Sequence, residues 1–276
     1  MSLDTTIGFI GGGNMAEALI RGLIHGAGVA ADHIGVSDPR RDRMAELHEV
    51  HGIRTSSDNL ELVGHSDIVV LAVKPQIMPV VLEEIRDQLR PDALIISIAA
   101  GITTTVIQDG LADNTRVVRT MPNTPALVQT GATAIAAGAH ATDDDLATAK
   151  KMFDAVGLSV VVPESQLDAV TGLSGSGPAY IFLLVESLIE GGVSVGLSER
   201  DAASLAVQTV LGAAKLLVET GEAPALLREK VTSPGGTTVA GLAALTDGGL
   251  RETVVAAVQA ASARSAELGK SDSDDG

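Results

Sequence analysis

The chain has 276 residues, of which 45% are apolar, and a formal net charge of −16. This length and apolar content predict a globular protein with room for two domains and exclude a disordered chain. The sequence has no cysteine, which excludes disulfides, thiolate catalysis and cysteine-bound zinc, and its acidic balance argues against nucleic acid as a partner.

The first predicted element is a short apolar strand, Thr6–Ile10, which ends in a glycine-rich turn and is followed by a helix over Met15–His25. Gly11, Gly13 and Ala16 match the G-x-G-x-x-A form of the dinucleotide fingerprint. In this motif the first glycine permits a tight turn and the second lets the backbone approach a pyrophosphate. Free N–H groups at the helix N-terminus then favour the phosphates. The stretch predicts a dinucleotide site, and an ordinary glycine-rich loop is the alternative.

Short β-like runs and helical patterns alternate through the rest of the first half. Further strands are predicted at His33–Ser37, Ile68–Ala72, Leu94–Ser97, Arg116–Thr120, Ala132–Ala136 and Ser159–Val162. Helices are predicted between them at Arg40–His51, Ile77–Leu89, Thr103–Leu111 and Asp144–Ala155. This alternation predicts an α/β fold with a doubly wound parallel sheet, as in Rossmann-like domains.

Strand patterns end after Pro163, and long helical patterns follow. The helices are predicted at Ala179–Val195, Glu199–Thr220, Ala223–Val231, Thr237–Thr246 and Leu250–Leu268. We therefore predict a dinucleotide-binding domain over residues 1–163, an all-helical domain over residues 164–270 and a disordered acidic tail over residues 271–276. The helix that starts near Pro178 is apolar nearly all round, which predicts burial in a core or a subunit interface and favours a dimer.

Polar residues at strand ends are candidate dinucleotide contacts, because ligands lie beyond the carboxyl ends of parallel strands. Asp38 would accept hydrogen bonds from the ribose hydroxyls of NAD, whereas Arg40 and Arg41 would suit the 2′-phosphate of NADP. Both cofactors stay open, and a plain polar turn is the alternative. Lys74 either lines the cleft or is a surface lysine, and Asn123 either orients a nicotinamide or braces its own turn.

Two glycine-containing polar stretches lead into helices of the second half. Leu173–Ala179 is predicted to be a flexible loop. In the second stretch, Gly235 and Gly236 precede a helix and leave backbone N–H groups exposed, which suits a carboxylate. The hydroxyls of Thr237 and Thr238 add donors, and simple helix capping is the alternative.

The residue types that are absent from the predicted helical domain limit the reactions that the protein can catalyse. All six histidines lie in the predicted dinucleotide-binding domain, and the only tyrosine, Tyr180, lies inside the apolar helix. A histidine-assisted alcohol dehydrogenase is therefore disfavoured. A cyclic imine fits better, because its basic nitrogen arrives protonated and the enzyme has mainly to position it.

Six segments together resemble the pyrroline-5-carboxylate reductase family: GFIGGGNMAEALIRGL, LAVKPQ, SIAAGI, RTMPNTPALV, TGLSGSGPAYIF and VTSPGGTTVAGL. The resemblance runs from Ile7 to about Leu268. It implies a Rossmann-like domain followed by a helical dimerisation domain, and a homodimer that in many members assembles into a ring of dimers. The implied reaction is reduction of 1-pyrroline-5-carboxylate to L-proline, the last step of proline biosynthesis, with NADPH as the cofactor and NADH also possible.

The resemblance also implies site residues, with Thr238 as the catalytic residue, whose hydroxyl would hydrogen-bond the ring nitrogen. Contacts to the substrate are expected from Glu164, Ser176, Ser233, Gly236, Thr237 and Thr238. Contacts to the cofactor are expected from Ile10, Gly11, Gly12, Gly13, Asn14, Met15, Ser37, Asp38, Arg40, Asn59, Ala72, Val73, Lys74, Pro75, Ala100 and Asn123. No metal is expected. Lys230 stands where the family commonly has Asp or Asn, a departure that concerns affinity rather than the reaction.

Two other functions compete with this one. A reductase of the same architecture, such as a β-hydroxyacid dehydrogenase, would need Lys215 or Lys230 as an acid in the helical domain. A non-catalytic NADP-binding regulator would have a degenerate site, against which the intact Thr238 argues. A six-membered cyclic imine is a further candidate substrate.

Location and surface follow from the composition. No signal peptide is recognised, and no apolar run is long enough to span a bilayer, which predicts a cytoplasmic protein without membrane partners. The charge of −16 is either an ordinary solvated surface or an adaptation to high salt, which we favour because salt screens the repulsion between excess carboxylates.

Overall fold

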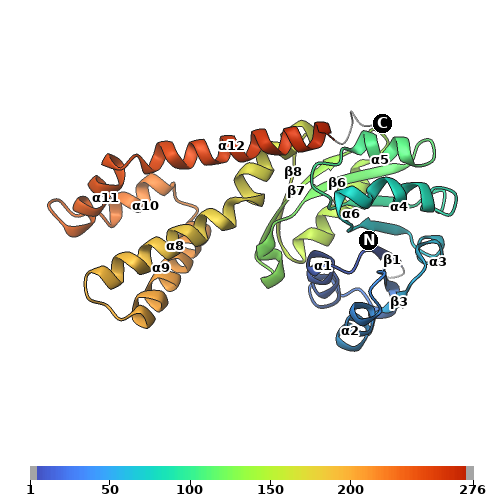
Figure 1. Cartoon of the computed structure of the whole chain (residues 1–276), viewed down its shortest axis with the longest axis horizontal. Helices are drawn as coiled ribbons and strands as arrows, with labels where there is room; N and C mark the ends of the chain where they lie inside the picture. Colours follow the sequence, from blue (N-terminus) through green and yellow to red (C-terminus); the bar gives the residue numbers. More distant parts are fainter. Residues whose placement is uncertain (1–4, 272–276) are drawn as a thin grey trace. The chain divides into compact units, whose positions relative to one another are not determined.

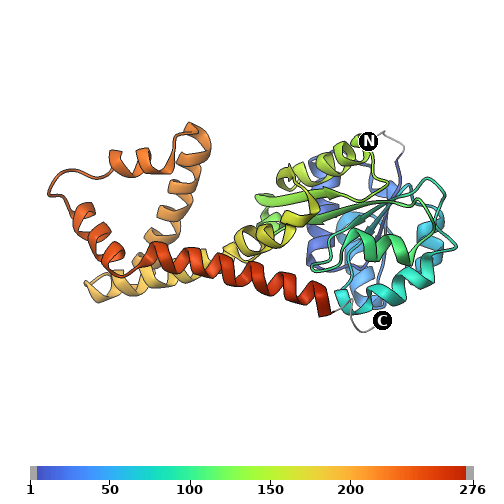
Figure 2. The same cartoon turned by 90° about the horizontal axis from the view of Figure 1, so that it is seen from above.

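A computed structural model describes residues 5–271, which divide into two compact units (Figures 1 and 2). The first unit comprises the chain up to Ser176 together with the residues from Ala260 onward, and the second comprises Gly177–Gln259. The predicted acidic tail lies outside the described residues except for Ser271, which ends the last helix. The predicted domain boundary at residue 163 stays a prediction.

A single sheet forms the centre of the first unit, with the strand order β3-β2-β1-β4-β5-β6-β7-β8 in the described part of the chain. Its strands are β1 (Ile7–Ile10), β2 (Ile34–Ser37), β3 (Arg54–Ser56), β4 (Ile68–Leu71), β5 (Leu94–Ser97), β6 (Arg116–Met121), β7 (Gly131–Ala137) and β8 (Gly157–Val161). Neighbouring strands are parallel except for the antiparallel pair β6 and β7. The order reverses between β1 and β4, and such a switch point is where doubly wound sheets bind ligands.

Helices cover both faces of this sheet, as Figure 2 shows. They are α1 (Asn14–His25), α2 (Arg41–His51), α3 (Asn59–Gly64), α4 (Met78–Ile85), α5 (Thr104–Gly110), α6 (Asp143–Asp154) and α7 (Leu167–Val170). Alternate residues of β1 enter different cores, because strand side chains point to opposite faces in turn. Phe9 packs in a core with residues of α1, α2 and α6, and Ile10 packs in a core with residues of α3, α4 and α5. The predicted doubly wound sheet is confirmed.

Among the strands and α-helices of the first unit, the sequence patterns missed β3, α3 and the four-residue helix α7. Arg54 and Thr55 of β3 are exposed, so this edge strand has no apolar alternation to recognise. Helix α3 has only six residues, and its clearest signal is Asp58, whose carboxylate accepts a hydrogen bond from the Leu60 N–H at 2.8 Å. Strand β3 and helix α3 complete the β2 side of the switch point.

Helices make up the second unit. They are α8 (Gly177–Ser194), α9 (Glu199–Thr220), α10 (Pro224–Lys230), α11 (Thr237–Asp247) and the start of α12 (Leu250–Ser271), whose last turns belong to the first unit. The prediction of a flexible loop over Leu173–Ala179 was wrong. Thr171–Gly175 forms a π-helical turn, and α8 follows almost at once. The glycines suggested a loop, but the backbone stays helical through them.

Much of the apolar surface of α8 and α9 is exposed within a single chain. Phe182 and Leu183 of α8 are 62% and 63% exposed, and Leu211 of α9 is 57% exposed. The core alternative for α8 is therefore wrong, and the subunit interface remains. By length and composition alone, the helical stretches Glu164–Ser194 and Glu199–Thr220 would be able to cross a membrane, contrary to the expectation that no apolar stretch is long enough.

Candidate dinucleotide and substrate sites

A cavity of about 760 Å³ opens in the first unit at the carboxyl ends of β1, β2 and β4. Among the predicted cofactor residues it is lined by Ile10, Gly11, Gly13, Asn14, Ser37, Asp38, Arg40, Asn59, Ala72, Val73 and Lys74. The sequence analysis missed four further lining residues, Pro39, Ser57, Ile77 and Val81. Of these four, only Pro39 could have been predicted from the sequence, because it directly follows Asp38. The cavity lies at the switch point of the sheet, where a dinucleotide is expected.

The turn between β1 and α1 has the geometry that the fingerprint requires. Gly11 has a φ of +99°, and a Cβ there would lie 2.5 Å from the carbonyl oxygen of Ala72. Only glycine fits this position. Gly13 is the N-cap of α1, and a Cβ built on it would meet no atom within 4 Å. The N-cap and the first residue of the helix therefore line the cavity with open space beside Gly13, so the residues present fit a pyrophosphate group.

Asp38 is buried at the end of β2, and both of its carboxylate oxygens have hydrogen-bond partners. Oδ2 accepts from the Gly12 N–H at 2.9 Å, and Oδ1 accepts from the Arg40 N–H at 3.0 Å. The Arg40 guanidinium donates to both oxygens. Burial alone would raise the pKa of Asp38, but the hydrogen bonds from Arg40 and Gly12 outweigh it and lower the pKa to about 2. The carboxylate is therefore ionised and committed to the protein, whereas the Arg40 side chain is 57% exposed at the cavity rim.

Other polar side chains line the rim of the cavity. The hydroxyl of Ser37 donates to Asn59 Oδ1, and Asn59 Nδ2 donates to Glu84 at 2.7 Å. Lys74 is exposed and lines the cavity, which favours the cleft role over that of an unrelated surface lysine. Lys74 and the second N–H of Asn59 can donate to a bound nucleotide, whereas the Ser37 hydroxyl has already donated its one hydrogen and can only accept.

Five predicted cofactor residues do not line this cavity: Gly12, Met15, Pro75, Ala100 and Asn123. Met15 packs against the core. Asn123 accepts from the Ala132 N–H at 2.8 Å and donates to the Ser174 hydroxyl at 3.1 Å, so its contacts are those of the bracing alternative. A contact between Asn123 and a nicotinamide stays a prediction.

Glu164 has partners for both carboxylate oxygens within the first unit. It accepts from the N–H and hydroxyl of Thr104 at 2.7 and 2.6 Å and from the Arg119 guanidinium at 3.1 Å. It thereby satisfies the first residue of α5 and pairs with a buried cation. These contacts explain Glu164 structurally, and its predicted contact with the substrate stays a prediction. Ser176 follows the π-helical turn, and its N–H donates to Thr171 at 2.9 Å.

The second unit contains the other predicted substrate loop, Ser233–Thr238. Gly235 has a φ of +72°, and the Gly236 N–H donates to the Ser233 carbonyl at 2.9 Å. Gly236 is then the N-cap of α11 and brings no side chain to cap it. The N–H groups of Thr237 and Thr238 lie in the first helical turn, where no carbonyl of the helix precedes them. Such a terminus binds a carboxylate well.

Two family models match the two halves of the chain. "Pyrroline-5-carboxylate reductase dimerisation" matches residues 164–268, and "NADP oxidoreductase coenzyme F420-dependent" matches residues 6–101. The second model covers the fingerprint turn and the strands around the cavity. The first covers the substrate loop and the apolar helices α8 and α9.

Several relatives that match nearly the whole chain are named pyrroline-5-carboxylate reductase. The pyrroline-5-carboxylate reductase of Methanosarcina acetivorans is 48% identical over 96% of this chain and 98% of its own length. That of Escherichia coli is 39% identical over 98% and 100%. Among solved structures, a pyrroline-5-carboxylate reductase from Coxiella burnetii has a TM-score of 0.92 at 42% identity, covering 96% of this chain and 98% of that one. The Plasmodium falciparum enzyme, solved with NADP bound, has a TM-score of 0.86 at 31% identity over 98% and 100%.

Proposed function

Because the chain belongs to the pyrroline-5-carboxylate reductase family, we propose how its residues carry out the reduction that defines the family. The enzyme reduces 1-pyrroline-5-carboxylate to L-proline with NAD(P)H, the last step of proline biosynthesis. The observation that carries this function is the near full-length similarity, and the cavity at the switch point agrees with it.

We assign the dinucleotide to the cavity of the first unit and favour NADPH over NADH. The N-terminus of α1 would face the pyrophosphate, and the Ser37 and Asn59 side chains would face the ribose. Asp38 is held by Gly12 and Arg40, so it is not presented to a ribose diol. The exposed Arg40 guanidinium supplies the charge that a 2′-phosphate needs.

The Ser233–Thr238 loop is assigned to the substrate. The N–H groups of Thr237 and Thr238 would bind its carboxylate at the N-terminus of α11, and the Thr238 hydroxyl would hydrogen-bond the ring nitrogen. The nicotinamide, when bound, supplies a hydride to the imine carbon. As the new C–H bond forms, the π electrons of the C=N bond become the nitrogen lone pair. The nitrogen arrives already protonated, so the chain has to hold and orient the ring rather than donate a strong acid.

Oligomerisation follows from the match to the dimerisation model, and a homodimer accounts for the exposed apolar surface of α8 and α9. Both helical stretches that are long and apolar enough to span a membrane lie within residues 164–268, the segment that matches the dimerisation model. We therefore propose that they bury their apolar faces in a soluble cytoplasmic dimer and not in a membrane. Assembly into a ring of dimers stays a prediction from the family resemblance.

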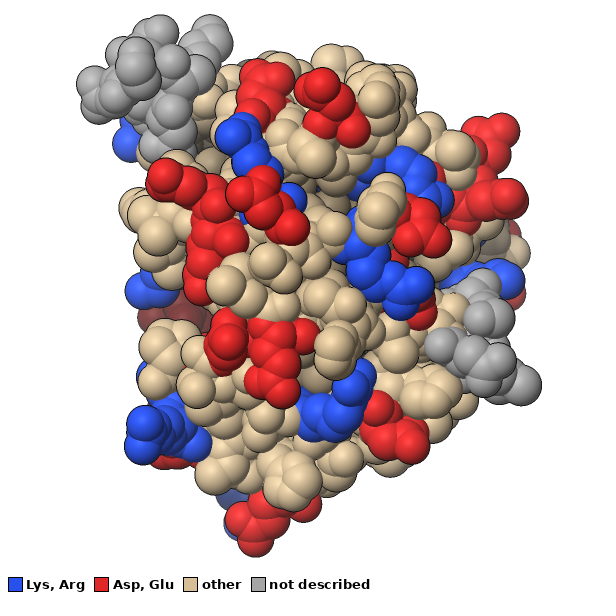
Figure 3. Space-filling model, turned by 90° about the vertical axis from the view of Figure 1, so that its right-hand side faces the viewer, with Lys and Arg blue, Asp and Glu red and all other residues tan. Residues whose placement is uncertain are grey.

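The salt adaptation is also a proposal. The net charge is −16, and on the face shown in Figure 3 acidic side chains are spread among Lys and Arg. In dilute buffer the excess carboxylates repel one another, and added salt screens that repulsion. We propose that the assembled enzyme requires salt for full stability.

The reaction is tested with NADPH deuterated at the transferable position of the nicotinamide. We expect L-proline that carries one deuterium at the former imine carbon. A six-membered cyclic imine with NADPH and a β-hydroxyacid with NADP⁺, assayed in parallel, distinguish the other substrates. Proline without deuterium, or faster turnover of a β-hydroxyacid, would contradict the assignment.

A further inference from the structure

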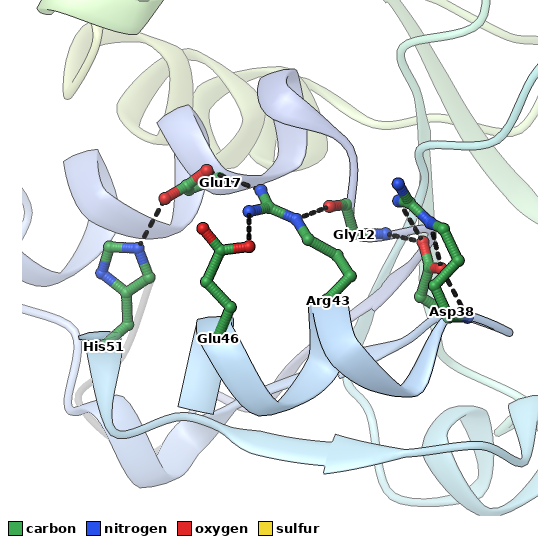
Figure 4. Close-up of polar contacts among 7 residues, drawn as sticks. Gly12, Glu17, Asp38, Arg43, Glu46 and His51 are labelled. Carbon is green, nitrogen blue, oxygen red and sulfur yellow. Dashed lines mark hydrogen bonds and ion pairs between the residues drawn. The ribbon is translucent and has the colours of Figure 1, made fainter. Parts of the chain in front are cut away.

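The buried peptide groups of Gly12 are held by two charged side chains. Its N–H donates to Asp38 at 2.9 Å, and its carbonyl accepts from Arg43 Nε at 2.7 Å (Figure 4). Gly12 itself does not line the cavity, whereas Gly11 and Gly13 on either side of it do. The Gly12 groups therefore serve the protein and not a cofactor.

The Arg43 guanidinium is itself fixed from several sides. Its side chain is 12% exposed, and its two terminal nitrogens pair with Glu17 at 2.5 Å and with Glu46 at 2.8 Å. Glu17 lies in the first turn of α1, and its other oxygen lies 3.3 Å from Nε2 of His51, a side chain that is 5% exposed. Figure 4 shows these side chains of α2 facing α1 and the turn. Arg43 thus joins α2 to the start of α1 and to the turn that precedes α1.

Peptide geometry connects this contact to the cavity. The Gly12 carbonyl and the Gly13 N–H belong to the same planar trans peptide, so the two groups point in opposite directions. A side chain that fixes the carbonyl therefore also fixes the direction of the N–H. Gly13 lines the cavity, and a Cβ built on it would meet no atom within 4 Å, so its backbone is accessible to a ligand.

We propose that Arg43 is a positioning residue of the dinucleotide site, which orients the Gly13 N–H toward a cofactor phosphate by holding the Gly12 carbonyl. Arg43 acts through the backbone and does not touch the cofactor. The proposal rests on the assignment of NADPH to this cavity. It adds that the phosphate-binding turn is organised by side chains behind it and not by glycine alone.

The test is the Arg43→Lys variant, which keeps the charge but loses the fork that reaches Gly12, Glu17 and Glu46 together. We expect the Kd for NADPH, measured by calorimetry, and the KM for NADPH to rise about tenfold, the scale of one charged hydrogen bond. We expect kcat to stay within about twofold, because no group near the substrate changes. Arg90→Lys is the matched control, since Arg90 pairs with Asp67 at 2.8 Å on another part of the unit.

A purely structural role for Arg43 predicts something else: a lower melting temperature or a smaller active fraction, with unchanged Kd and KM. That result would overturn the proposal. Should Arg43→Lys fail to fold, Glu17→Gln tests the same point, with an expected rise in Kd of about threefold from the weakened Glu17–Arg43 pair. An unchanged Kd in that variant would also overturn it.

The measurements separate this proposal from the catalytic one. Wild-type protein that binds NADPH but does not reduce the imine would refute the proposed reaction and leave the Arg43 test intact. Wild-type protein that binds neither NADPH nor NADH would overturn both.

Discussion

Replacing Asp38 with Asn tests the view that this carboxylate supports the protein and does not bind a ribose. In the folded chain its pKa is lowered from 3.8 to about 2 by the hydrogen bonds from Arg40 and Gly12, which outweigh the effect of burial. Such a lowering of the pKa corresponds to about 2 kcal/mol of stabilisation by the ionised form. Asp38→Asn keeps the shape of the side chain and removes the charge, so it should lose about that much free energy of unfolding near neutral pH.

The pH dependence gives the sharper test. A carboxyl whose pKa is lowered on folding contributes its full stability above its ordinary pKa, here 3.8, and loses it as the pH falls through about 2. The difference between the wild type and Asp38→Asn should therefore be constant above about pH 5 and fall to roughly half by pH 3. The other carboxyls titrate equally in both proteins, so the difference in free energy of unfolding reports the contribution of Asp38 alone.

Urea unfolding followed by circular dichroism measures the effect. Salt and protein concentration are held constant, because the stability of an oligomer depends on both. Asp113→Asn, the same substitution at an exposed position, should stay within about 0.5 kcal/mol of the wild type. If the stability difference for Asp38→Asn is absent, or does not change between pH 7 and pH 3, the reasoning about Asp38 is refuted.

Three further predictions concern the reaction, the cofactor and salt. Thr238→Ala should lower kcat/KM for the imine by about tenfold to a thousandfold. Thr238→Ser keeps the hydroxyl and should retain most of the activity. Unchanged kinetics for the alanine variant would remove Thr238 from the mechanism. Arg40→Ala should lower kcat/KM for NADPH by about tenfold and leave kcat/KM for NADH nearly unchanged, because only NADPH carries the 2′-phosphate. An equal loss with both cofactors would contradict this role of Arg40. Dilution from molar salt into low-salt buffer should lower the melting temperature and the activity together, and full stability in dilute buffer would count against the salt adaptation.

The sequence predicted much of this fold because the first unit obeys simple rules. Strands such as β1 and β4 are continuous apolar runs, since both faces of a parallel sheet are covered by helices. The fingerprint turn was recognisable because Gly11 occupies a backbone conformation that other residues avoid. The edge strand β3 and the short helix α3 lack such patterns, so they were missed.

The candidate site was predictable in its backbone parts and less so in its side chains. Asp38 and Arg40 were recognised as adjacent groups with competing roles, but only their geometry shows that they bind each other. The Arg43 contacts depend on where α2 packs against α1, which no local pattern records. The helix-like continuation at Thr171–Gly175 was hidden by glycines that usually favour a loop.

The most direct test of the account is steady-state oxidation of NADPH and, separately, of NADH by the wild-type enzyme with 1-pyrroline-5-carboxylate in high salt. We predict turnover to L-proline with both cofactors and a higher kcat/KM for NADPH. The exposed Arg40 can bind the 2′-phosphate of NADPH, whereas the Asp38 carboxylate is already hydrogen-bonded to the protein and does not bind a ribose diol. Binding of a dinucleotide without reduction of this imine would contradict the central claim.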